Sequence, residues 1–105
     1  MGRKAFESLT ETMFYVLMAF LHQERCGTEV VDFVEQKTCG RLTLGPGTLY
    51  TILSRFEAEG FVEETAVEGR KRTYRLTDRG LALYDEELDR LRRCVADGDS
   101  ERRYL

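Results

Sequence analysis

The fold of this chain is indicated most clearly by the segment Gly45-Pro46-Gly47-Thr48-Leu49-Tyr50-Thr51-Ile52-Leu53-Ser54-Arg55-Phe56-Glu57-Ala58-Glu59-Gly60. Its large apolar residues, apart from one tyrosine, recur with the 3.6-residue period of a helix: Leu49, Ile52, Leu53 and Phe56. The only proline of the chain stands where a helix can begin without losing a needed N–H group, and Gly60 can end that helix. The stretch therefore predicts a helix with one buried face.

The other face of this predicted helix carries short hydroxyls, one phenol and one arginine, which can approach a DNA groove and donate to phosphates and base edges. The free N–H groups at the helix start can bind a phosphate oxygen. We therefore predict five DNA-binding residues here: Gly47, Thr48, Tyr50, Thr51 and Arg55. The alternatives are that the Gly-Pro-Gly turn only separates two structural elements and that these side chains belong to an ordinary solvent-exposed surface.

Two helices are expected before this stretch. Ser8-Leu9-Thr10-Glu11 has the pattern of a capping box that opens a helix to about Gln23. The apolar residues of that helix cover more than one face, which predicts burial on two sides. Thr28 can cap a second helix, which runs to about Lys37 and ends at Cys39-Gly40.

The period changes after residue 60. Two β-prone runs, 61–67 and 72–76, are separated by Glu68-Gly69-Arg70-Lys71, which has the pattern of a hairpin turn. Thr77 can cap a last helix, which is expected to end at Asp97-Gly98-Asp99-Ser100. Its apolar residues are spaced 3, 4, 3 and 4 apart, as in the seam between two helices: Leu81, Tyr84, Leu88, Leu91 and Val95.

This order of elements predicts a mainly α fold with a two-stranded β wing (α+β), that is, a winged helix-turn-helix with a C-terminal dimerisation helix. We expect residues 1–80 to form the winged-helix DNA-binding domain and residues 81–105 to form the dimerisation helix and tail. The predicted dimer interface combines the first and last helices: Phe14, Leu17, Met18, Leu81, Tyr84, Leu88, Leu91 and Val95.

The net charge of −3 argues mildly against nucleic acid, but the charges are unevenly distributed. Residues 69–79 include five basic side chains and one acidic one, whereas residues 85–99 include six acidic side chains and three arginines. The predicted wing tip presents Arg70, Lys71 and Arg72, which can follow the DNA backbone or enter the minor groove. A merely solvated hairpin is the alternative.

Composition argues against several other classes of protein. Three scattered cysteines and a single histidine predict neither a metal site nor a cofactor, although a redox role for one thiol stays open. No nucleophile with a neighbouring base and no phosphate loop can be assembled, so we expect no enzyme. Residues 13–21 form the longest apolar stretch, which is too short to span a bilayer, and residues 1–7 lack the features of a signal peptide. We therefore expect a cytoplasmic protein without a membrane partner.

The segment from Gly45 to Val62 resembles the G-P-G-T-L-Y-x-x-L-x-R-L-E-x-x-G-L-I motif of PadR-type regulators, and the segment from Gly69 to Gly80 resembles that family's wing and helix start. The resemblance implies the short subfamily, a homodimer whose last helix packs against the partner's first helix, and repression released by a small hydrophobic effector. A two-fold dimer would bind a pseudo-palindromic operator in double-stranded DNA.

The chain departs from the family pattern in two respects. It has Gly27-Thr28-Glu29-Val30 where the family often has Gly-Tyr-Glu-Ile, and it has no tryptophan, which some drug-binding members use at the dimer interface. Plain dimer core is therefore an alternative to an effector pocket near these apolar residues: Phe14, Leu17, Met18, Leu88 and Leu91. The alternative function is a winged-helix module for protein–protein interaction without DNA binding, which the acidic net charge fits.

Overall fold

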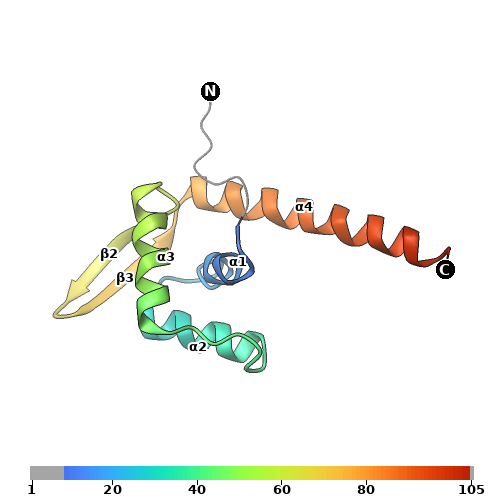
Figure 1. Ribbon diagram of the computed structural model, residues 1–105. Coiled ribbons are helices and arrows are strands. Elements are labelled where there is room, and N and C mark those ends of the chain that lie inside the picture. The colour runs from blue at the N-terminus through green and yellow to red at the C-terminus, as the bar shows by residue number, and fades with distance from the viewer. Residues whose placement is uncertain (1–8, 105) are drawn as a thin grey trace.

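The computed structural model describes residues 9–104, in which helices pack together and a small antiparallel sheet extends to one side as a hairpin (Figure 1). The elements are α1 (Glu11–Met18), β1 (Arg25–Cys26), α2 (Gly27–Lys37), α3 (Pro46–Ala58), β2 (Val62–Glu68), β3 (Lys71–Leu76) and α4 (Asp78–Arg102). The predicted winged helix-turn-helix with a long C-terminal helix is confirmed. The sheet has the strand order β1-β3-β2, and its two-residue strand β1 was not predicted because so short a strand has no detectable period.

Helix α1 differs from the prediction at both ends. It begins at Glu11 because Oγ1 of Thr10 accepts the N–H of Met13 at 3.1 Å, so Thr10 is the N-cap. Ser8, the first residue of the predicted capping box, lies outside the described residues, as does the segment 1–7 that was compared with signal peptides. The predicted end near Gln23 is wrong, because the helix already ends at Met18.

Helix α2 begins at Gly27, with Cys26 rather than Thr28 as its N-cap, so that part of the prediction is wrong. The backbone N–H of Cys26 donates to Oε1 of Glu29 at 2.8 Å, as in a capping box. The predicted end at Cys39-Gly40 is confirmed: Gly40 has a φ of +80°, and its N–H donates to the carbonyl of Glu35 at 2.8 Å.

Helix α3 follows the prediction, with Gly45 as its N-cap and Pro46 in its first turn. Its inward face is the predicted one: Leu49, Ile52, Leu53 and Phe56. Helix α4 continues to Arg102, so the predicted end at Asp97-Gly98-Asp99-Ser100 is wrong. A single glycine costs a helix only about 1 kcal/mol, which does not stop it.

The core lies between α1, α2, α3 and the first half of α4. The Phe14 ring on α1 stacks on the Tyr84 ring on α4, with centroids 4.9 Å apart and planes 2° apart. Both side chains are buried within their own chain, and Leu17 has no exposed surface. Of the predicted dimer interface, Leu17 therefore offers nothing to a second subunit, whereas Leu81 and Val95 are exposed.

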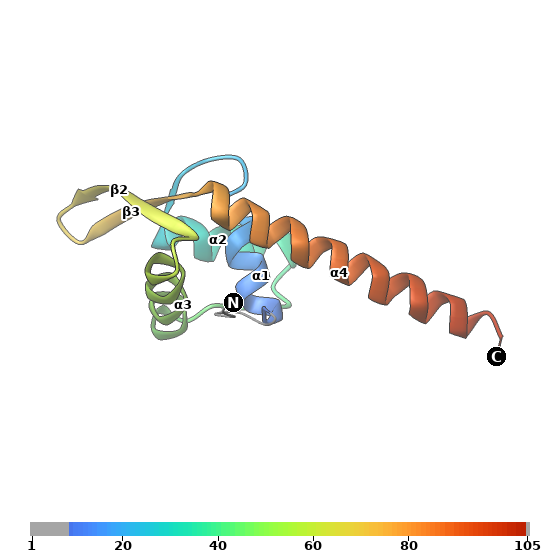
Figure 2. The same cartoon turned by 90° about the horizontal axis from the view of Figure 1, so that it is seen from above.

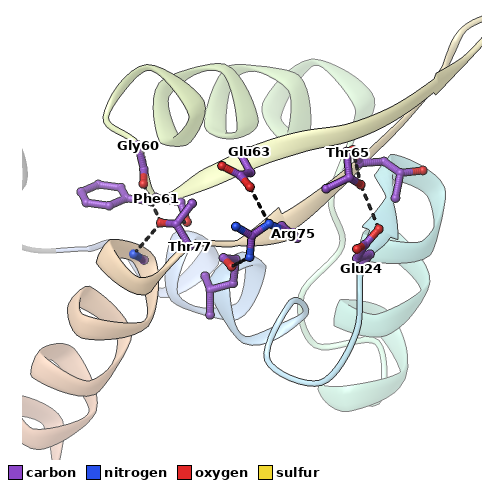
Figure 3. A network of polar contacts seen from close by, with 10 residues as sticks. Glu24, Gly60, Phe61, Glu63, Thr65, Arg75 and Thr77 are labelled. Carbon is purple, nitrogen blue, oxygen red and sulfur yellow. Dashed lines mark hydrogen bonds and ion pairs between the residues drawn. The ribbon is translucent and has the colours of Figure 1, made fainter.

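Thr77 joins the end of α3 to the start of α4 (Figure 3). Its Oγ1 donates to the carbonyl of Gly60 at 2.6 Å and accepts the N–H of Gly80 at 3.0 Å. The wing and α3 consequently lie together at one end of the molecule, and α4 leaves in the opposite direction (Figures 1 and 2). Among residues 9–104, no helix combines the length and the apolar character that crossing a membrane requires.

Candidate nucleic-acid interface

Helix α3 exposes the face on which the DNA-binding residues were predicted. The exposed residues of α3 include Thr48, Tyr50, Thr51, Ser54, Arg55 and Ala58. The start of the helix is open, since a Cβ added at Gly47 would meet no atom within 4 Å. Because the first N–H groups of an α-helix lack intrahelical acceptors, those of Gly47 and Thr48 can donate to an anion.

Thr51 differs from its neighbours on this face. Its hydroxyl donates to the carbonyl of Gly47 at 2.9 Å, one turn earlier in the same helix. The hydroxyl proton is therefore used within α3, and the oxygen is left as an acceptor. A phosphate oxygen needs a donor, so Thr51 fits contact with a base amino group better than contact with the DNA backbone.

A cleft of about 480 Å³ lies between the start of α2, helix α3 and the wing. Its lining is Cys26, Gly27, Thr28, Glu29, Tyr50, Arg70, Lys71, Arg72 and Tyr74. The cleft thus unites Tyr50 with the three predicted wing cations, which are far apart in the sequence. The other predicted residues of α3 (Gly47, Thr48, Thr51 and Arg55) lie outside its lining.

The contribution of α2 to this cleft was not predicted from the sequence. Residues 26–29 supply the first turn of α2, where N–H groups are unsatisfied by the helix itself. The start of α2 directly follows β1, and this order could have indicated that α2 begins beside the wing. The strand β1 was not predicted, so the signal was not seen. Tyr74 was missed because it is buried and was counted only as a strand residue.

Gly27 allows α3 to approach the start of α2. A Cβ added there would lie 3.2 Å from Cδ2 of Leu49 and 3.9 Å from Oη of Tyr50. The phenol of Tyr50 therefore lies over the first turn of α2, although 54% of the residue stays exposed. This places the Tyr50 hydroxyl at the cleft, where it can donate to a bound phosphate.

The wing turns through a two-residue loop, Gly69-Arg70, with Glu68 and Lys71 paired on either side. Gly69 has a φ of +64°, a conformation that other residues rarely adopt. The loop projects Arg70 from the tip. Neither Arg70 nor Lys71 forms an ion pair with any residue in the described part of the chain.

Two other basic residues of the wing are paired with glutamates of the neighbouring strand. Nη1 of Arg72 lies 2.9 Å from Oε2 of Glu64, and Nε of Arg75 contacts Oε2 of Glu63 (the latter pair is shown in Figure 3). In the sequence, Arg72 and Arg75 were counted together with Arg70 and Lys71 as basic charge. The structure shows instead that part of that charge is balanced within the hairpin.

The ionisable groups of the cleft differ in charge. Hydrogen bonds from Cys26 lower the pKa of Glu29, with a smaller contribution from the charge of Lys71, so this carboxylate is anionic at neutral pH. Burial raises the pKa of the Tyr74 phenol, and the nearby charges of Glu57 and Glu64 raise it further. Tyr74 is therefore a neutral hydrogen-bonding group beside the wing cations.

No metal-binding cluster of three or more His, Cys, Asp or Glu residues is found within residues 9–104. The three cysteines are free: Cys26 is buried at the cleft, while Cys39 and Cys94 are exposed. Nη1 of Arg90 donates a hydrogen bond to Sγ of Cys94 at 3.8 Å.

Comparison with known proteins yields a family and a curated relative. Residues 16–86 match the model of the transcriptional regulator PadR-like family. The transcriptional regulator Rv3488 of Mycobacterium tuberculosis is 43% identical over 63 residues, which are 54% of this chain. The match spans 59% of that relative, less than two thirds of its length.

Solved structures share the fold. A transcriptional regulator from Clostridium thermocellum has a TM-score of 0.75 at 21% identity, with 85% of this chain and 87% of that chain covered. Bacillus subtilis PadR in complex with operator DNA has a TM-score of 0.64 at 20% identity, with 72% and 46% covered.

Bordetella bronchiseptica BpsR, whose DNA binding is regulated by 6-hydroxynicotinic acid, has a TM-score of 0.68 at 21% identity. The match covers 87% of this chain and 61% of that chain. These TM-scores establish that the folds are alike. The family match agrees with the prediction of a regulator rather than an enzyme. Since the family model matches more than half of the residues of this chain, the chain belongs to the PadR-like family of transcriptional regulators.

Proposed function

We propose that this regulator binds double-stranded operator DNA with the exposed face of α3 and with the cleft beside the wing. The observation that carries the proposal is the cleft, where Tyr50, Arg70 and Lys71 surround the first turn of α2. Phosphate oxygens are bound by cationic side chains, and they accept hydrogen bonds from the N–H groups at a helix start. The complex of Bacillus subtilis PadR with operator DNA supports this use of the shared fold.

Within this proposal, α3 enters the major groove and the wing follows the backbone. Gly47 and Thr48 would donate backbone N–H groups to phosphate, while Thr51 and Arg55 would face base edges. Arg70 and Lys71 would neutralise phosphates or reach the minor groove. Residues 1–80 would then act as the DNA-binding domain and residues 81–105 as the dimerisation helix and tail.

The exposed half of α4 supports a homodimer. The helix has 25 residues, which is about 37 Å of length, and its second half extends away from the other helices (Figures 1 and 2). Val95 is 62% exposed and shares a stripe with Leu81, Leu88 and Leu91. Leu88 and Leu91 already pack against the core of their own chain, whereas Leu81 and Val95 are exposed. A second copy of the chain would cover these exposed residues and stabilise the second half of the helix, which is only marginally stable in water by itself.

A two-fold dimer repeats its α3 helices, so its operator would be pseudo-palindromic, with half-sites about one helical turn apart. We propose that occupancy of such an operator represses transcription in the cytoplasm and that a small hydrophobic effector releases the protein. The regulation of BpsR by 6-hydroxynicotinic acid supports the effector. Such a molecule would fit a cavity of about 350 Å³ between α1 and α4. The lining combines apolar and aromatic side chains with polar and charged ones: Leu9, Phe14, Tyr15 and Leu91 with Thr10, Glu11, Glu87 and Arg90.

The test is a titration of the purified protein against a fluorescent duplex selected from the DNA upstream of its own gene, at two salt concentrations. We expect saturable binding that resists excess random DNA and weakens as salt rises, and a nuclease footprint with two-fold symmetry. If the operator lies elsewhere in the genome, a genome-wide selection of bound fragments would identify it. No preferred fragment and no footprint would favour the protein–protein interaction module instead.

A further inference from the structure

One ion pair of the wing lies on the side of the hairpin that faces the cleft. Successive side chains of a strand point to opposite faces, and Glu64 is the register partner of Tyr74. Glu64 therefore shares a face with Tyr74 and with Arg72, which comes two residues earlier in β3, and both of these line the cleft. Glu63 and Arg75 form the corresponding pair on the opposite face.

The pair between Glu64 and Arg72 is well defined for a surface contact. Nη1 of Arg72 lies 2.9 Å from Oε2 of Glu64, and only 26% of the glutamate side chain is exposed. A β-bulge follows Glu64, since the register shifts between Glu64 and Ala66. Oγ1 of Thr65, the bulged residue, donates to Oε1 of Glu24 at 2.9 Å (Figure 3), which holds this part of β2 against the loop before β1.

The wing as a whole is close to neutral. Residues 62–76 contain four basic side chains and three acidic ones, which leaves a net charge of +1. Binding to DNA of any sequence depends on cations that neutralise phosphates and release counterions. A cation already paired with a carboxylate releases no counterion, so Arg72 adds little to that binding while it stays on Glu64.

We propose that Glu64 is a specificity-determining residue, which holds Arg72 in an internal ion pair and releases it to a phosphate only when α3 is correctly seated on an operator. This inference rests on the proposed DNA binding. On random DNA the pair stays closed and the wing contributes mainly Arg70 and Lys71. On the operator the wing is fixed close to the backbone, and Arg72 exchanges its carboxylate partner for a phosphate.

The first experiment compares Glu64→Gln with the wild-type protein on an operator duplex and on a random duplex, across a series of salt concentrations. On random DNA we expect tighter binding, with a log–log salt slope steeper by about 0.9 for each protomer, since one more phosphate is neutralised. Operator binding should change less, so the ratio of the two affinities falls. Glu63→Gln is the matched control, because it removes the same charge from the opposite face and should leave the ratio unchanged.

The second experiment adds Arg72→Gln to both backgrounds. If Arg72 is held in reserve, Arg72→Gln alone should leave the salt slope on random DNA unchanged, and in the Glu64→Gln background it should abolish the gain. Equal effects of Glu64→Gln and Glu63→Gln, or an unchanged affinity ratio, would overturn the role of Glu64 while leaving DNA binding intact. Absence of DNA binding by both wild type and Glu64→Gln would overturn the proposed function as well.

Discussion

At the scale of single residues, Gly80 shows how tightly α4 is attached to the wing. A Cβ added at Gly80 would lie 2.1 Å from the carbonyl oxygen of Phe61 and 2.7 Å from Cδ1 of Leu76. Backbone cannot move away as a flexible side chain can. We therefore expect Gly80→Ala to lower the free energy of unfolding by about 1–3 kcal/mol, although alanine is the better helix former.

Gly98 provides the matched control in the same helix. A Cβ added there meets nothing within 4 Å, so Gly98→Ala should leave stability unchanged or raise it by up to about 1 kcal/mol. Urea unfolding followed by circular dichroism measures both variants. A Gly80→Ala protein as stable as the wild type would contradict the close contact between α4 and Phe61.

Glu29 gives a pH-dependent prediction at the same scale. Hydrogen bonds from Cys26 lower its pKa from the ordinary value of 4.5, so the ionised carboxylate stabilises the folded state. This stability is fully present above pH 4.5 and is lost as the pH falls through the folded-state pKa. We expect the difference in unfolding free energy between the wild type and Glu29→Gln to be largest near neutral pH and to shrink in acid.

The measurement is chemical unfolding of both proteins from neutral pH down to the acid range. Glu35→Gln is a suitable control, because Glu35 lies in the same helix, is exposed and is remote from the N-cap. Its effect should not decline in the same way on acidification. A Glu29→Gln difference that is constant with pH would show that the carboxylate charge does not stabilise the start of α2.

Among the elements, we propose that the wing and α3 share the binding of DNA. Arg70 and Lys71 are the wing cations that form no ion pair within residues 9–104. Changing both to glutamine should weaken binding to operator and random duplexes alike. The salt slope should become shallower by about 1.8 for each protomer, because two phosphate contacts are lost.

Arg102 and Arg103 supply the control for the wing double variant. Both are exposed at the far end of α4, so their replacement by glutamine makes the same change in net charge away from the wing. Fluorescence anisotropy over a salt series is the measurement. If both double variants changed the slope equally, net charge alone would explain the effect and the wing would have no special role.

At the scale of the whole molecule, the stripe on α4 predicts the oligomeric state. Val95 is exposed and adds nothing to the core of its own chain, so Val95→Asp should leave the fold intact and shift the protein from dimer to monomer. Operator binding should then weaken, because each protomer reads only one half-site.

Sedimentation analysis at several concentrations, together with circular dichroism, distinguishes dissociation from unfolding. Ala96→Asp is the control, because position 96 is exposed, lies next to Val95 and points away from the stripe. An unchanged dimer in Val95→Asp would place the interface elsewhere, and a wild-type monomer at all concentrations would remove it altogether.

Local sequence signals were enough to predict α3, the hairpin and the order of the longer elements, although not the two-residue strand β1. The signals for α3 all lie within one stretch: Pro46 at the start, four apolar residues of helical period, and Gly60 at the end. The signal for the hairpin was equally local, because it lies in the two-residue loop that contains Gly69. Such signals act between residues a few positions apart, so they are legible without knowledge of the fold.

How these elements share their surfaces follows only from the packing of the folded chain. Phe14 and Tyr84 have the apolar spacing of a helix seam, but whether that seam faces the same chain or a second copy depends on how α1 meets α4. The pairing of Glu64 with Arg72 depends on strand register and on a bulge, and the cleft on the approach of α2, α3 and the wing. These contacts join residues distant in the sequence, and burial and strand pairing are set by the packed chain as a whole rather than by any local pattern.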